Sequence, residues 1–80
     1  MITKEDVLGY FADHNGTAAA RPLARHFNLE LRAAELHLER LAKYGLIVQR
    51  VHGFYVLTDK GRGRLAWYRG ETSEGQIEFA

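Results

Sequence analysis

Residues 44–62 constrain the fold most, because two short β-type runs stand there between two helical patterns. Residues 47–51 and 54–57 are rich in β-branched and aromatic side chains, and His52 and Gly53 lie between them. Such a pair of runs, separated by two residues ending in glycine, is typical of a β-hairpin. Since a two-stranded hairpin is only marginally stable alone, we expect it to pack against helices while its tip projects into solvent.

Two helices are predicted in the first part of the chain. The first begins at Thr3, a candidate N-cap with Asp6 three residues further on, and ends near Gly16, because glycine accepts a left-handed cap. Residues 17–20 fit either a short strand or a lead-in to the next helix. Pro22 suits the first turn of a brief second helix, where its missing N–H is not needed.

The third predicted helix covers residues 30–44 and has two distinct faces. At 100° per residue, its buried stripe consists of Leu31, Ala34, Leu38 and Leu41. The opposite face carries Arg32, Leu36, Glu39 and Lys43, with Ala33 and Arg40 beside it.

A fourth helix is predicted from the N-cap Thr58 to about Arg69. Gly61 and Gly63 each weaken it by ~1 kcal/mol relative to alanine. Packing of apolar side chains must therefore hold it in place, and the candidates are Leu65, Ala66 and either Trp67 or Tyr68. The elements together predict an α+β, mostly helical fold with a three-helix core, a short two-stranded hairpin and a C-terminal helix.

Charge divides the chain into three parts. Residues 16–70 carry ten basic and four acidic side chains, a net charge of +6, whereas residues 1–15 carry −2 and residues 71–80 carry −3. A chain of 80 residues holds one domain, which we place at residues 1–70. Residues 71–80 are expected to form an acidic tail that is either disordered or part of a dimer contact. The basic middle suggests a polyanionic partner.

Several classes of protein are disfavoured by what the sequence lacks. It has no cysteine for a disulfide or a thiolate metal site, and its four histidines are not paired at helical spacing. It has no glycine-rich phosphate loop and no nucleophile motif, so we expect neither an enzyme nor a protein with a metal or another cofactor. The first six residues become acidic where a signal peptide requires an apolar run. No apolar stretch approaches the ~20 residues of a membrane helix, and we expect a cytoplasmic protein.

Two segments resemble the winged helix-turn-helix domain of small bacterial and archaeal transcriptional regulators, such as the MarR-like, ArsR-like and PadR-like groups. They are LERLAKYGLI at residues 38–47 and YVLTDKGR at residues 55–62, and the resemblance spans about residues 5–69. It implies a DNA-binding transcriptional regulator. The third helix would then enter the major groove, and the 46–57 hairpin would be a wing against the backbone or the minor groove.

The resemblance also implies which residues contact double-stranded DNA. Base contacts would come from the third helix, at Arg32, Ala33, Leu36, His37 and Arg40. Arginine can bind guanine through two hydrogen bonds, and small apolar side chains can touch a thymine methyl. Contacts to the phosphate backbone, which give affinity and register, would come from Arg21, Arg25, Lys43, Arg50 and His52.

Other interpretations of these residues remain open. Arg32 and Arg40 could belong to a solvated helix face with ion pairs to Glu35 and Glu39, and the balanced charge of the third helix leaves room for a protein partner. The alternative function is therefore a winged-helix interaction module that does not bind DNA. A regulator of this kind would pair as a homodimer, for which the candidate anchors are Trp67, Tyr68, Ile77 and Phe79.

Overall fold

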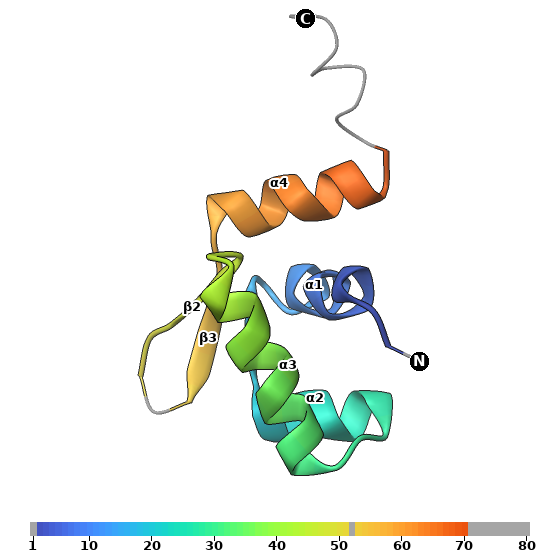
Figure 1. Ribbon diagram of the computed structural model, residues 1–80, viewed down its shortest axis with the longest axis vertical. Helices are drawn as coiled ribbons and strands as arrows, with labels where there is room; N and C mark the ends of the chain where they lie inside the picture. The colour runs from blue at the N-terminus through green and yellow to red at the C-terminus, as the bar shows by residue number, and fades with distance from the viewer. Residues whose placement is uncertain (1, 52, 71–80) are drawn as a thin grey trace, which may run out of the picture.

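The computed structural model describes residues 2–51 and 53–70. Its elements follow the order α1 (Lys4–Asp13), β1 (Thr17–Ala19), α2 (Ala20–Phe27), α3 (Leu31–Lys43), β2 (Ile47–Gln49), β3 (Phe54–Leu57) and α4 (Asp59–Tyr68). Within those residues the fold is α+β, as predicted. Figure 1 shows α2 and α4 on opposite sides of α1, with the β2–β3 hairpin projecting to one side of the helices.

Local caps fix both ends of α1, as the sequence predicts. The Thr3 hydroxyl accepts a hydrogen bond from the Asp6 backbone N–H at 3.2 Å, and the Asp6 carboxylate accepts one from the Thr3 N–H at 2.8 Å. At the other end, Asn15 and Gly16 have positive φ angles, and the Gly16 N–H returns to the Phe11 carbonyl at 2.7 Å. These caps set where the chain leaves α1 and enters β1.

A tight turn joins α2 to α3. Pro22 lies in the first turn of α2, as expected, and Asn28 ends the helix in the left-handed conformation with φ 57°. The Leu29 N–H then bonds to the Ala24 carbonyl at 2.8 Å. The two helices pack against each other directly after this turn, which gives the helix–turn–helix arrangement at the bottom of Figure 1.

The sheet has one strand more than the hairpin that the sequence predicts. Its order is β1-β3-β2 and all pairings are antiparallel. Ala18 pairs with Tyr55, and Gln49 pairs with Tyr55 from the other side. Residues 17–19 are thus a strand and not only a lead-in to α2. Because β1 precedes α2 and β3 follows α3, the sheet connects the two ends of the helix–turn–helix unit.

The hairpin turn is wider than a two-residue loop. Regular β2 pairing ends at Gln49, after which the Arg50 N–H bonds to the Phe54 carbonyl and the Phe54 N–H bonds to the Val51 carbonyl, both at 2.8 Å. Gly53 has φ 82°. A glycine in this conformation is common in three-residue hairpin loops.

One apolar core joins the four helices to the sheet. Its largest fully buried side chains are Phe11, Leu8, Leu23, Leu38, Leu46, Ile47 and Val7. Ala34, Leu38 and Leu41 of the predicted α3 stripe are buried, but Leu31 is 37% exposed. Leu31 is the first residue of α3, so the stripe predicted from periodicity extends past the edge of the core. Of the two aromatic candidates on α4, Tyr68 packs on the core while Trp67 is 56% exposed.

The start of α4 is fastened to the junction between α3 and β2. The Thr58 hydroxyl accepts from the Gly61 N–H at 3.0 Å and lies 2.7 Å from the Gly45 carbonyl oxygen. The Thr58 N–H also bonds to the Leu46 carbonyl at 3.1 Å. Gly61 packs so closely here that a Cβ would overlap the Leu46 carbonyl oxygen. From the sequence alone, Gly61 was expected only to weaken the helix, whereas its packing against Leu46 requires a glycine.

We predict that Gly61→Ala lowers the free energy of unfolding by at least about 2 kcal/mol, because the added methyl must displace backbone. Gly63→Ala is the matched control in the same helix, since a Cβ at Gly63 would have no atom of the described residues within 4 Å. That control should raise the stability by up to ~1 kcal/mol through helix propensity. Urea unfolding of both variants measures the difference, and equal effects would contradict the contact.

Candidate nucleic-acid interface

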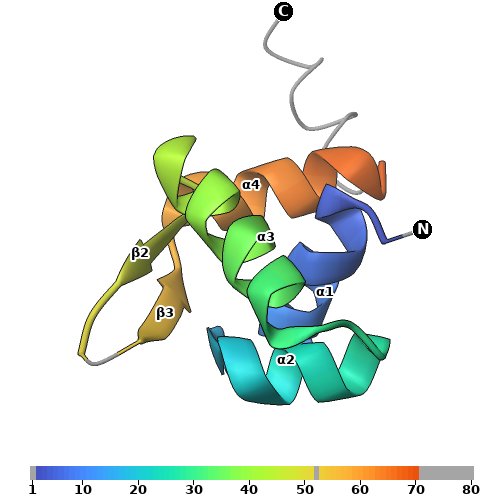
Figure 2. The same cartoon turned by 60° about the horizontal axis from the view of Figure 1, so that its bottom comes forward.

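The outer face of α3 carries most of the predicted base-contact residues. Arg32, Leu36 and Arg40 are exposed, while Ala33 and His37 are half-buried. Leu36 is 40% exposed, but Leu38, two residues along, is fully buried. Figure 2 shows α3 in front of α1 and α4, with the hairpin beside it. The core therefore holds α3 by one side and leaves the opposite side open to a partner.

Arg32 is paired on this face. Its Nη1 atom lies 3.4 Å from Oε1 of Glu35 and 3.8 Å from Oε2 of Glu39. The Arg32 side chain is 67% exposed, and those of Glu35 and Glu39 are 41% and 56% exposed. Ion pairs this exposed contribute between about 0 and 1 kcal/mol. The guanidinium can therefore leave its carboxylates at small cost when a stronger acceptor approaches.

Arg40 and Lys43 are the uncompensated cations of α3. Both are exposed, and neither takes part in an ion pair within residues 2–51 and 53–70. Together with Leu36 and Glu39 they line a shallow hollow of about 240 Å³ on the outer face. This part of α3 can thus offer two charged donors next to one apolar side chain.

A groove of about 260 Å³ separates α3 from the hairpin. Its lining includes the carboxylates Glu35 and Glu39 on the α3 side and Gln49 and Tyr55 on the sheet side. Nothing in the sequence pattern predicts this groove. The pairing of Gln49 with Tyr55, which puts both on the sheet face toward α3, could be found only once the strand register was known.

The other face of the sheet exposes apolar side chains. Val48 pairs with Val56, and Phe54 pairs with Ala19, so all four lie on the face opposite Gln49 and Tyr55 because side chains alternate along a strand. Val48 is 44% exposed and Phe54 is 52% exposed. Sequence reasoning identified these residues as strand formers but could not show that they face solvent.

The predicted backbone contacts come from three separate elements. Arg21 and Arg25 are exposed on α2, Lys43 is exposed in the last turn of α3, and Arg50 is exposed just after β2. His52 lies outside the described residues. The structure therefore supplies these cations from α2, from the end of α3 and from the hairpin.

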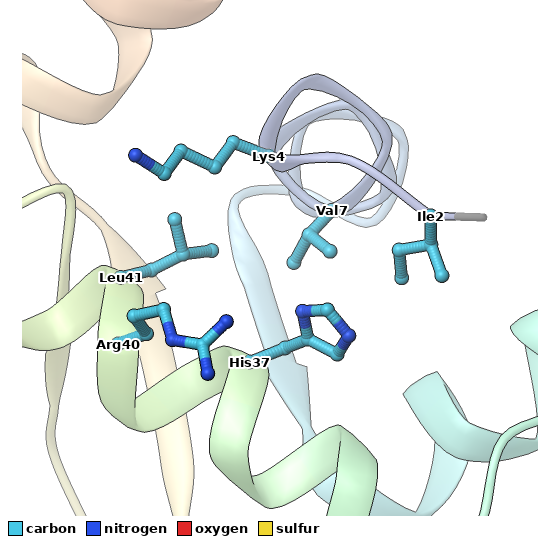
Figure 3. A pocket seen from close by; sticks show the side chains of 6 residues that line it. All are labelled: Ile2, Lys4, Val7, His37, Arg40 and Leu41. Atoms are coloured by element: carbon cyan, nitrogen blue, oxygen red, sulfur yellow. The ribbon is translucent and has the colours of Figure 1, made fainter.

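The His37 side chain points from α3 toward α1 and not toward the outer face of α3. Figure 3 shows its ring directed toward Ile2 and Val7, in a hollow between the start of α1 and α3 that Arg40 also lines. Two other histidines pack on Tyr10: the His14 ring stacks on it with centroids 4.0 Å apart, and the His26 ring is tilted against it at 4.8 Å. Over the described part of the chain, no three His, Cys, Asp or Glu residues are grouped so as to hold a metal ion.

None of the described helices combines the length and the apolar character needed to span a membrane. Comparison of the chain with protein-family models, with curated proteins and with solved structures gave no match.

The orientation of α3 can be tested with two leucines. We predict that Leu38→Ala lowers the free energy of unfolding by about 2–5 kcal/mol, because it opens a cavity in the core. Leu36→Ala should change it by no more than about 0.5 kcal/mol, because Leu36 lies at the surface. Guanidinium unfolding curves measure both effects. A large loss for Leu36→Ala would mean that the outer face is covered.

Proposed function

We propose that the chain is a winged helix-turn-helix domain that binds double-stranded DNA as a transcriptional regulator. The observation that carries the proposal is the open outer face of α3, with Arg32, Leu36 and Arg40 exposed next to a projecting hairpin. An α-helix fits the major groove, where each base pair presents its own pattern of donors and acceptors. In this proposal α3 reads bases and the β2–β3 hairpin is the wing.

The cations on neighbouring elements support the same proposal. Arg21 and Arg25 on α2, Lys43 in the last turn of α3 and Arg50 after β2 are all exposed. Phosphate contacts from elements on either side of a recognition helix fix its register on the duplex. The weak ion pairs of Arg32 also fit this proposal, since a guanine can replace the two exposed carboxylates as the hydrogen-bond acceptor of Arg32.

A homodimer is part of the proposal. Trp67 is the largest exposed apolar side chain on α4, and its ring centroid lies 5.4 Å from that of Tyr68. Ile77 and Phe79, the other candidate anchors, lie outside the described residues. A dimer would double the contacts and read two half-sites related by its symmetry.

The second candidate function is a protein-interaction module. It is favoured by the exposure of Leu36, Val48 and Phe54, and by the carboxylates Glu35 and Glu39 in the groove between α3 and the hairpin. Phosphate would be repelled by those carboxylates, whereas a basic protein segment would not. Salt dependence distinguishes the two functions.

We predict that binding to a mixed-sequence duplex weakens steeply with salt. If Arg21, Arg25, Lys43 and Arg50 each neutralise one phosphate, the slope of log K against log[salt] should be about −3.6 per chain, or roughly a hundredfold loss between 50 and 200 mM. Fluorescence anisotropy with a labelled duplex measures this slope. No binding at 20 mM salt would reject the DNA proposal and favour the interaction module.

We predict that Arg40→Ala or Arg32→Ala weakens binding to a selected site by ~1–3 kcal/mol with little change in melting temperature. The site would first be selected from a random duplex library. Arg62→Ala is the matched control, because it removes an equal charge from the exposed surface of α4. If the control weakens binding as much as the α3 variants do, α3 is not the reading element.

A further inference from the structure

The hollow between the start of α1 and the middle of α3 has an apolar floor. Val7 and Leu41 are 1% and 2% exposed, and Ile2 is half-buried beside them. The hollow measures about 110 Å³. Figure 3 shows Ile2 and Val7 directed into this space from the α1 side and Leu41 from α3. A small hydrocarbon group in the hollow would therefore lie mainly against Ile2, with the buried Val7 and Leu41 beneath it.

Three nitrogen-bearing side chains surround this floor. Lys4 comes from α1, and His37 and Arg40 come from α3. Lys4 is exposed, and its Nζ atom lies 4.6 Å from the centre of the exposed Tyr44 ring, a weak contact that the ammonium can leave for an anion. Arg40 has no ion-pair partner within the described residues. A lysine, an arginine and an imidazole N–H are all hydrogen-bond donors to an anion.

The acidic residues of α1 are kept away from this hollow. Glu5, Asp6 and Asp13 line a different hollow, on the side of α1 toward His26 and Arg69. The first turn of α1 thus divides its charges, with Lys4 on the α3 side and the carboxylates on the other side. Among residues 2–51 and 53–70, no carboxylate lines the hollow in which an anion beside Lys4 would lie.

From this combination of floor and rim, we propose that the α1–α3 hollow binds a short-chain aliphatic carboxylate. A cavity of ~150 Å³ holds benzene, so about 110 Å³ accommodates roughly four or five carbon atoms. The hydrocarbon part lies on Ile2, Val7 and Leu41. The carboxylate lies at the rim, where Lys4 and Arg40 neutralise it and His37 donates an N–H.

The site would also link this ligand to α3. Arg40 is one of the residues proposed to contact DNA, so this consequence, unlike the binding itself, rests on the proposed function. A carboxylate that occupies Arg40 would lower DNA affinity, and DNA would lower carboxylate affinity by the same factor.

The test is an NMR titration of the ¹⁵N-labelled protein, without DNA, using isovalerate as the probe. Saturable shifts are expected for backbone amides of residues 2–7 and 37–41, with a dissociation constant of the order of 1 mM. Two analogues each lack one feature of isovalerate: isovaleramide lacks its charge, and acetate lacks most of its hydrocarbon. Each should bind about tenfold more weakly than isovalerate. The proposal is wrong if isovalerate gives no saturable shifts there, or if either analogue binds equally well.

Two variants test the contribution of the rim. Lys4→Gln should weaken isovalerate binding about threefold or more with little change in melting temperature, because Lys4 is exposed. Lys60→Gln makes the same change of charge on α4, outside the lining, and should leave isovalerate binding unaltered. If both variants weaken isovalerate binding equally, the effect comes from the net charge of the protein and not from the rim, and the proposal is overturned. Because no DNA is present, failure here is distinguishable from failure of the proposed function.

Discussion

The packing of the first turn of α4 against the α3–β2 junction is the constraint on which the rest of the structure depends. The Thr58 backbone and side chain bond to Gly45 and Leu46, and Gly61 allows α4 to lie directly on the Leu46 carbonyl. This junction fixes where α3 ends, where β2 starts and how β3 leads into α4. The hairpin is therefore held at its base from both sides, while its turn extends away from the helices.

The same packing determines which surfaces are open. Because α1, α2 and the sheet bury one side of α3, its other side is left with charged residues and the exposed Leu36. The balance of charge on that side determines whether it attracts an anionic partner. Arg32 is offset by Glu35 and Glu39, whereas Arg40 and Lys43 are not offset within the described residues. A partner that supplies anions gains the most favourable electrostatic contact near Arg40. The carboxylate proposed for the α1–α3 hollow would use the same residue.

Features decided by local chemistry could be predicted from the sequence. The capping box at Thr3, the left-handed Gly16 after α1 and the N-cap at Thr58 each depend on a few neighbouring residues, and the sequence predicts all three. The buried stripe of α3 followed from periodicity alone, apart from Leu31. The α+β class followed from the order of these elements.

Features decided by contacts between distant residues could not be predicted. The sequence left residues 17–20 open between a strand and a lead-in, and residues 17–19 become a strand because β3, nearly forty residues later, offers a partner. The close contact of Gly61, the acidic groove beside the hairpin and the inward direction of His37 also depend on how elements meet. Of the candidate site, the exposed face of α3 was therefore predictable from periodicity, but the surroundings of its side chains were not.

The exposure of Trp67 has a practical consequence. The chain contains one tryptophan, and in the folded protein more than half of its surface is already in water. Its emission should consequently change little when the domain unfolds, and circular dichroism would follow unfolding better. Conversely, any molecule that covers α4 would shift that emission toward the blue, so the residue is a built-in optical reporter for this surface.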